Sequence, residues 1–361
     1  MQKETKRMEV PSVFVGKFGY PHISVGFLHT EKDQKHDDPL FWSKHNYSIA
    51  SVTKLRKNLV NAPFQSSVTE KLDKRLELAK MLVMAKKPAS VELTFTQKTT
   101  TSLKNQGEAI PYGPSTLLHT IQSPENIQTD VRLEKLFFDT DASATTAIHE
   151  LYKKGVDEHA ISKLLSVGGL GRGSLRKLVP TRWSITATDD TLSQSLKETL
   201  IGYDTHPYCA FTSDYLGNYF LILLFEGPFA FHFLEVLPDK SIKEDVELAL
   251  GRKEYAKQTT GGYYAAKVAV LEYLAKEKKV ASVFCIRFIT DEYYLSLGVW
   301  VVREAVKKTL LQNPLEFSDA TLLAKYATLF CQKKQNVSLE TYIQQSPVLR
   351  FVLKQKNLFD F

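Results

Sequence analysis

The segment GGLGRGSLRKLVPTRWSITATDD, residues 168–190, joins four glycines to four cationic side chains. Glycine lets backbone amides approach an anion closely, and arginine and lysine supply charge-assisted hydrogen-bond donors. The segment therefore predicts a phosphate or nucleic-acid site, whose donors we expect to be Arg172, Ser174, Arg176, Lys177 and Arg182. The alternative is a glycine-punctuated turn that feeds a strand over 183–188, with solvated basic side chains and Trp183 anchored in the core. The glycine spacing matches neither a P-loop nor a dinucleotide fingerprint.

Two carboxylates, Asp189 and Asp190, close this segment. An aspartate at the start of a helix accepts hydrogen bonds from unsatisfied amides, and a helix is expected from here to residue 201. Helix capping therefore explains at least one of the two, and catalysis is the alternative. Further candidates for chemistry are Tyr20 and His22, which lie in a glycine-bearing turn expected between two N-terminal strands.

Residues 176–190, RKLVPTRWSITATDD, resemble the signature of the archaeal Nre family of DNA-repair proteins. Further stretches agree with that family in the same order: PSVFVGKFGYP at 11–21, GPS at 113–115, GNY at 217–219, GGYYAA at 261–266 and GVWVVRE at 298–304. The resemblance covers nearly the whole chain and implies a role in DNA repair, without a settled reaction. Many family members carry an N-terminal cysteine cluster, whereas the first cysteine here is Cys209, so a zinc role of that cluster does not carry over.

Composition and charge place the chain among ordinary globular proteins. Its 361 residues are 43% hydrophobic and 24% charged, with a net charge of +7 that favours polyanionic partners such as DNA or nucleotides. Three dispersed cysteines indicate a reducing compartment and give no reason to expect structural zinc. No apolar run approaches the length of a membrane span, so we expect a cytoplasmic, nucleoid-associated protein without a membrane partner.

Hydrophobic periodicity predicts a mixed α/β fold, with a mixed sheet and flanking helices. Two short helices over 142–153 and 157–165 read as a helical hairpin that delivers the glycine segment, with a DNA-reading helix-turn-helix as the alternative. The apolar runs 218–225 and 229–237 predict a hairpin near the middle of a sheet, covered on both faces. His232, inside the second run, is expected to be a core histidine with satisfied hydrogen bonds.

We expect two packed domains, residues 1–237 and a mainly helical 238–354, followed by a flexible tail over 355–361. That tail, QKNLFDF, resembles the peptide that docks replication sliding clamps of the proliferating-cell-nuclear-antigen (PCNA) type. One helical turn would bring Leu358 and Phe361 to one side, where both can fill a hydrophobic pocket beside Gln355 and Phe359. The alternative is a tail that folds back on its own domain.

The resemblance implies a DNA-repair protein. Together with the tail and the basic segment, it predicts that the sliding clamp recruits this protein and that residues 168–190 hold nucleic-acid phosphates. A rival hypothesis is an enzyme that hydrolyses a phosphodiester or glycosidic bond in a nucleotide or nucleic acid. A metal-dependent nuclease would need several carboxylates on one site, and the sequence offers Asp139, Asp141, Asp189 and Asp190. A third alternative is a scaffold without chemistry.

Overall fold

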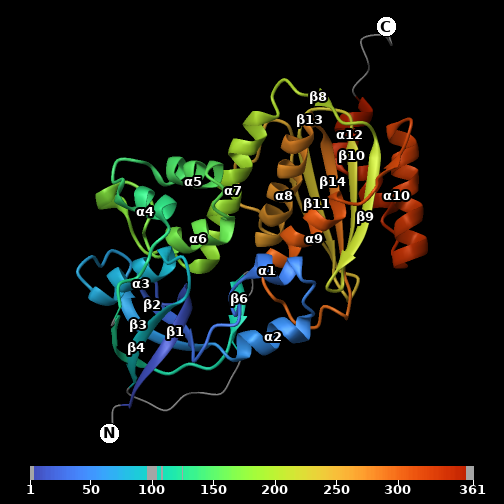
Figure 1. The fold of residues 1–361 in the computed structure, drawn as a ribbon. Coiled ribbons are helices and arrows are strands. Elements are labelled where there is room, and N and C mark those ends of the chain that lie inside the picture. The colour runs from blue at the N-terminus through green and yellow to red at the C-terminus, as the bar shows by residue number, and fades with distance from the viewer. Residues whose placement is uncertain (1–3, 96–103, 107–108, 124, 355–361) are drawn as a thin grey trace. The chain divides into compact units, whose positions relative to one another are not determined.

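A computed structural model describes residues 4–95, 104–106, 109–123 and 125–354 (Figure 1). It has the mixed α/β architecture expected from the sequence, which is thereby confirmed. The chain forms two compact units, Met1–Leu192 with Ser296–Gly298, and Ser193–Leu295 with Val299–Phe361. None of the helices in the described part of the chain has the length and apolar character needed to span a membrane.

The first unit contains a five-stranded antiparallel sheet in the order β3-β2-β1-β4-β7. Its strands are β1 (Glu4–Val15), β2 (His22–Thr30), β3 (Val60–Ser67), β4 (Ala89–Phe95) and β7 (Leu118–Gln122). Helices α3 (Lys74–Met84) and α6 (Glu158–Ser166) pack against β1 and against each other. Shorter elements are α1 (Pro39–Lys44), α2 (Ile49–Lys57), the pair β5 (Lys104–Gln106) and β6 (Ala109–Tyr112), and α4 (Val131–Phe138).

The predicted helical hairpin before the glycine segment is confirmed. Helix α5 (Ala144–Lys153) begins at Ser143, whose hydroxyl accepts a hydrogen bond from the amide of Thr146, and α6 begins at Asp157 in the same way. Both caps satisfy amides that the first helical turn leaves without partners. Their apolar stripes are buried, so the pair is held by packing and delivers the chain to Gly168.

The second unit is built on a six-stranded sheet in the order β12-β11-β14-β10-β9-β15. The strands are β9 (Cys209–Tyr215), β10 (Asn218–Phe225), β11 (Ala230–Val236), β12 (Ile242–Glu247), β14 (Ser282–Ile289) and β15 (Leu315–Glu316). The expected pairing of β10 with β11 is wrong, because β14 lies between them, parallel to β11 and antiparallel to β10. The central position of both strands is confirmed, since they are buried on both faces.

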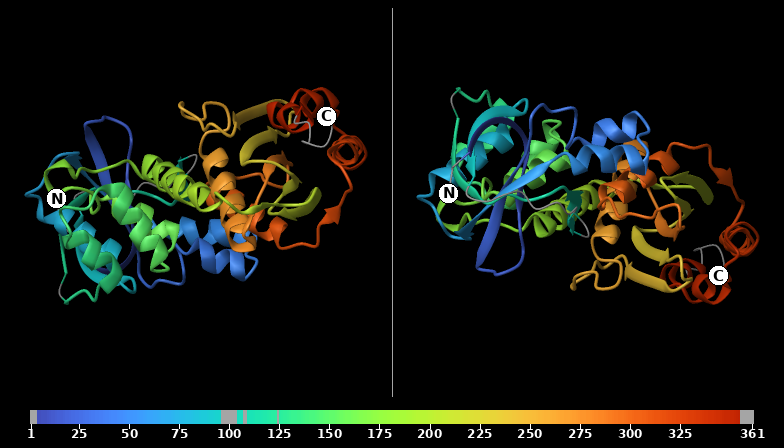
Figure 2. Two further views of the ribbon diagram at one scale, coloured as in Figure 1. Left: turned by 90° about the horizontal axis from the view of Figure 1, so that it is seen from above. Right: turned by 90° about the horizontal axis from the view of Figure 1, so that it is seen from below.

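Helices cover both faces of this sheet (Figure 2). Helices α8 (Gly261–Glu277) and α9 (Trp300–Leu310) lie on one face, where Tyr263 contacts Phe231. Helices α10 (Ala320–Gln335), α11 (Glu340–Gln345) and α12 (Pro347–Lys354) pack against the other face around Leu234 and Phe284. A short bridge joins β8 (Asp204–Thr205) to β13 (Lys279–Val280). The second unit is thus a three-layer sandwich with a continuous apolar core.

His232 lies in that core, 1% exposed, with its ring stacked on Phe284. Its two ring nitrogens are 2.9 Å from the Ser346 hydroxyl and 2.9 Å from the Glu244 carboxylate. The prediction of a core histidine with satisfied hydrogen bonds is therefore confirmed.

The sequence-based domain boundary after residue 237 lies between β11 and β12, which pair along their length. The two compact units divide between Leu192 and Ser193, and the predicted domain boundary stays a prediction.

Candidate nucleic-acid interface

Residues 183–188 form a helix, so the predicted strand is wrong. Helix α7 (Thr181–Thr199) begins directly after Pro180, whose carbonyl accepts hydrogen bonds from the amides of Trp183 and Ser184. The alternation of large side chains in WSITA imitates a strand, but the segment is helical, and the buried residues of α7 include Ser184, Thr188 and Leu192, which lie four residues apart. Trp183 is 47% exposed rather than anchored in the core.

The same shift removes the expected capping role of the two aspartates. Asp189 and Asp190 lie inside α7 instead of at its start, and Asp189 is buried. The carboxylate of Asp139 accepts hydrogen bonds from the amides of Asp141 and Ala142. Among the residues that the structure describes, no three His, Cys, Asp or Glu side chains gather as they would around a metal ion. The hydrolase hypothesis stays a prediction.

Three glycine amides of the segment donate hydrogen bonds to backbone carbonyls of the protein. Gly168 and Gly169 donate to the carbonyls of Leu165 and Leu164, which closes the end of α6, and Gly173 donates to Thr140. Gly168 has a φ of +71°, the left-handed conformation typical of a helix terminus. These three amides are therefore engaged within the protein. A phosphate in this region would depend on side chains rather than on a cradle of these amides.

The guanidinium of Arg176 is engaged by backbone carbonyls. It donates to Gly171 at 2.6 Å, to Phe137 at 2.5 Å and to Asp139 at 2.6 Å, with a longer contact to Leu136 at 3.5 Å. Burial lowers the pKa of this guanidinium, and the nearby Asp139 carboxylate opposes that shift. The fork therefore joins the glycine segment to the end of α4. These contacts hold the loop that carries Lys177, and the predicted phosphate contact of Arg176 stays a prediction.

A groove with a volume of about 170 Å³ runs between residues 68–80 and residues 167–178. Lys71 and Lys177 line it, and both side chains are exposed. The ammonium of Lys71 lies 3.5 Å from the carbonyl of Ser174, so the Lys71 side chain contacts the glycine segment. Lys71 was not found from the sequence, because it is about 100 residues from the segment that it contacts.

The N-terminal turn lies next to this groove. The amide of Val68 donates to the carbonyl of Pro21, and the carbonyl of Val68 accepts from the amide of Leu178. The amide of Val15 donates to the Thr181 hydroxyl at 2.9 Å. These bonds bring Tyr20 to the start of α7, where its ring lies 5.7 Å from the ring of Trp183.

Together these segments form what we call the aromatic–basic surface, which consists of Lys17, Phe18, Tyr20, Lys71, Arg172, Lys177, Arg182 and Trp183. Phe18 is 77% exposed and Tyr20 is 45% exposed. Residues 16–22 and 168–188 contain no acidic residue. His22 is exposed at the first position of β2. The structure thus brings the predicted Tyr20 and Arg182 to one region, and it adds Phe18, Lys71 and Trp183.

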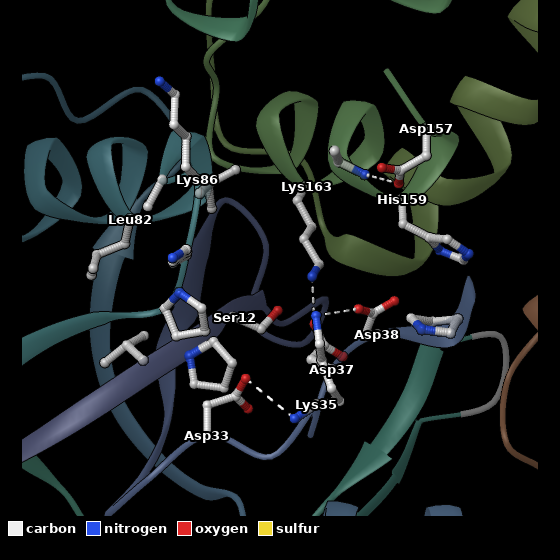
Figure 3. Close-up of a pocket in the computed structure, with 18 of the residues that line it drawn as sticks. Ser12, Asp33, Lys35, Asp37, Asp38, Leu82, Lys86, Asp157, His159 and Lys163 are labelled. Atoms are coloured by element: carbon white, nitrogen blue, oxygen red, sulfur yellow. Dashed lines mark hydrogen bonds and ion pairs between the residues drawn. The ribbon is translucent and has the colours of Figure 1, made fainter. Parts of the chain in front are cut away.

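A second cavity in the first unit has a volume of about 270 Å³ and is lined by four aspartates and four lysines (Figure 3). Its charged groups are largely paired. Lys163 reaches from α6 to the carboxylate of Asp37, which also accepts from Arg56, and Lys35 pairs with Asp38. Asp157 caps α6 by accepting from the amide of Ala160. This cavity is therefore held together by internal ion pairs.

Basic side chains beside exposed aromatic rings define a candidate nucleic-acid interface. Two family models cover the chain, the archaeal Nre N-terminal model over residues 1–243 and the archaeal Nre C-terminal model over 247–361. The chain belongs to the archaeal Nre family, as its resemblance indicated.

Three curated relatives agree with this membership. The chain is 33% identical over 322 residues to DNA repair protein NreA of Archaeoglobus fulgidus, which covers 86% of this chain and 81% of that protein. It is 31% identical over 323 residues to DNA repair protein NreA of Haloferax volcanii, covering 82% and 76% respectively. It is 30% identical over 369 residues to DNA repair protein NreB of A. fulgidus, covering 97% and 90%. No solved structure matches the chain significantly.

Proposed function

We propose that this protein acts in DNA repair, that the aromatic–basic surface binds DNA, and that the C-terminal tail recruits the protein to a sliding clamp. The names of its relatives support the repair role. The observation that carries DNA binding is the gathering of Lys71, Arg172 and Lys177 beside exposed aromatic rings. Residues 16–22 and 168–188 contain no acidic residue, whereas Glu70 and Glu77 line the groove beside Lys71. Lysine and arginine bind the phosphate backbone and release counterions.

The double replacement of Lys71 and Lys177 by alanine tests the phosphate contacts. We expect DNA affinity at about 0.15 M salt to fall about tenfold, because the variant lacks two ammonium groups that would contact DNA phosphates. The dependence of log affinity on log salt should become shallower by about 0.9 for each lost duplex phosphate contact. Fluorescence anisotropy with a labelled oligonucleotide measures both quantities.

Lys257→Ala is the matched control, since Lys257 is an exposed lysine of the second unit that pairs with Glu254. It should leave both the affinity and the salt slope at wild-type values. If the double variant also retains wild-type affinity and slope, these lysines are solvated surface groups and the surface does not bind phosphates.

The tail Gln355–Phe361 lies outside the described residues, so its role rests on its resemblance to clamp-binding peptides. Deleting it should abolish binding to a PCNA-type clamp and leave the melting temperature unchanged, because the last described helix ends before it at Lys354. Calorimetry of the truncated protein against the clamp measures the loss. Phe361→Ala should reproduce the effect, whereas Asn357→Ala, outside the docking pattern, should not. Undiminished clamp binding by the truncated protein would remove the tail from the proposed function.

A further inference from the structure

We propose that Phe18, Tyr20 and Trp183 stack on unpaired bases, so that the DNA bound by the aromatic–basic surface is single-stranded or locally unstacked. This inference rests on the proposed DNA-binding function and names its substrate class. Lysines alone bind duplex and single strand alike, since both carry phosphates. Exposed aromatic rings discriminate between them, because a base offers its face only outside the double-helical stack.

The exposure of the three rings is the first argument. Phe18 is 77% exposed, Trp183 47% and Tyr20 45%, whereas the other two tryptophans of the chain, Trp42 and Trp300, are buried. Large aromatic side chains gain most when they are covered, so several exposed rings in one region indicate a surface that a ligand covers.

The rigidity of the support is the second argument. Trp183 stands in the first turn of the 19-residue helix α7. Gly19, between Phe18 and Tyr20, has a φ of +83°, and a Cβ there would lie 2.6 Å from the carbonyl oxygen of His22. Only glycine fits this turn, which therefore presents its two rings in a defined position. Rings held in advance lose little conformational freedom when a base stacks on them.

The charge around the rings is the third argument and points to nucleic acid rather than to an apolar protein partner. The ammonium of Lys17 lies 5.2 Å from the centre of the Phe18 ring, and Arg182 directly precedes Trp183. The groove with Lys71 and Lys177 adjoins the same turn through Val68. Alternating rings and cations match alternating bases and phosphates along a single strand.

The test compares a labelled 20-nucleotide oligothymidine with a duplex of the same length, using full-length wild-type protein and the variants Phe18→Ala, Trp183→Ala and Trp183→Phe. Wild type should bind the single strand more tightly. Phe18→Ala and Trp183→Ala should each weaken single-strand binding about tenfold, change duplex binding by less than about twofold and leave the salt slope unchanged. Trp183→Phe keeps a stacking ring and should retain most of the affinity.

Two further readings make the test specific. Oligothymidine should quench the tryptophan emission of wild type, because Trp183 is the exposed tryptophan among the three. Tyr294→Ala, which removes a 67% exposed ring of the second unit, should behave as wild type.

The possible failures are distinguishable. Equal wild-type affinity for single strand and duplex, with a salt slope that Lys71 and Lys177 control, would overturn base stacking and leave the proposed DNA binding intact. Undiminished oligothymidine binding by the two alanine variants would also overturn base stacking. If wild type binds neither DNA, the proposed DNA binding fails together with the inference.

Discussion

Replacing Asp37 by alanine is expected to lower the free energy of unfolding by about 3–5 kcal/mol. The Asp37 carboxylate is 5% exposed and lies 2.5 Å from a nitrogen of Arg56. It also lies 2.5 Å from the ammonium of Lys163 (Figure 3). Arg56 is itself 2% exposed and also donates to the carbonyls of Pro111 and His36. Alanine would leave this buried guanidinium without its counter-charge, which costs more than the ion pair contributes.

Denaturant unfolding at neutral pH measures the effect, and Lys35→Ala is the control. Lys35 pairs with Asp38 at the surface, where its side chain is 54% exposed, so its loss should cost less than about 1 kcal/mol. An Asp37→Ala midpoint equal to that of wild type would show that the buried pair contributes nothing to stability.

The same carboxylate predicts a dependence on pH. Burial would raise the pKa of Asp37, but the charges of Lys163 and Arg56 outweigh it and hold the pKa well below the ordinary range. A carboxylate with a lowered native pKa contributes its full stability above its unfolded pKa of about 4, and loses that contribution as the pH falls toward the native value. The stability difference between wild type and Asp37→Ala should therefore shrink below about pH 4.

Replacing Arg176 by alanine is expected to cost about 3 kcal/mol of stability, the second largest effect. The change removes charge-assisted donors from the carbonyls of Gly171, Phe137 and Asp139. Each such bond contributes about 1.5–3 kcal/mol to stability. The net loss is smaller than the sum, because water can hydrogen-bond to the exposed carbonyls in the variant. Arg176→Lys should recover little, because an ammonium cannot span carbonyls that a planar fork reaches together.

Thermal unfolding and DNA binding of the same variants separate the structural role from a phosphate contact. Arg172→Ala is the control, since Arg172 is exposed and its loss should change stability by less than about 0.5 kcal/mol. If Arg176→Ala keeps the wild-type melting temperature and loses DNA affinity, Arg176 contacts phosphate directly and the carbonyl bonds do not anchor the loop.

Local sequence patterns determined the elements whose signal is complete within a short window. The hairpin of α5 and α6 follows from its caps and its apolar stripe, and the burial of β10 and β11 follows from unbroken apolar runs. The basic character of 168–190 and the candidacy of Tyr20 were visible for the same reason, because charge and residue type need no partner to be read.

The tertiary structure decided everything that depends on distant partners. Residues 183–188 alternate like a strand, yet they are helical because Pro180 starts a helix there and small polar side chains occupy its buried face. The pairing of β10 and β11 with β14 joins segments about 50 residues apart or more, for which a local pattern contains no information. Bringing such distant strands together costs loop-closure entropy, and this cost is offset by side-chain packing that forms only in the complete fold.

The same distinction divides the candidate site. The sequence indicated which residues carry positive charge, but it could not show that the Arg176 guanidinium is engaged by carbonyls while Lys177 faces solvent. Nor could it show that Trp183 is exposed beside Tyr20, more than 160 residues away in the chain. A side chain's type is a local property, whereas its exposure and its partners are properties of the fold that surrounds it.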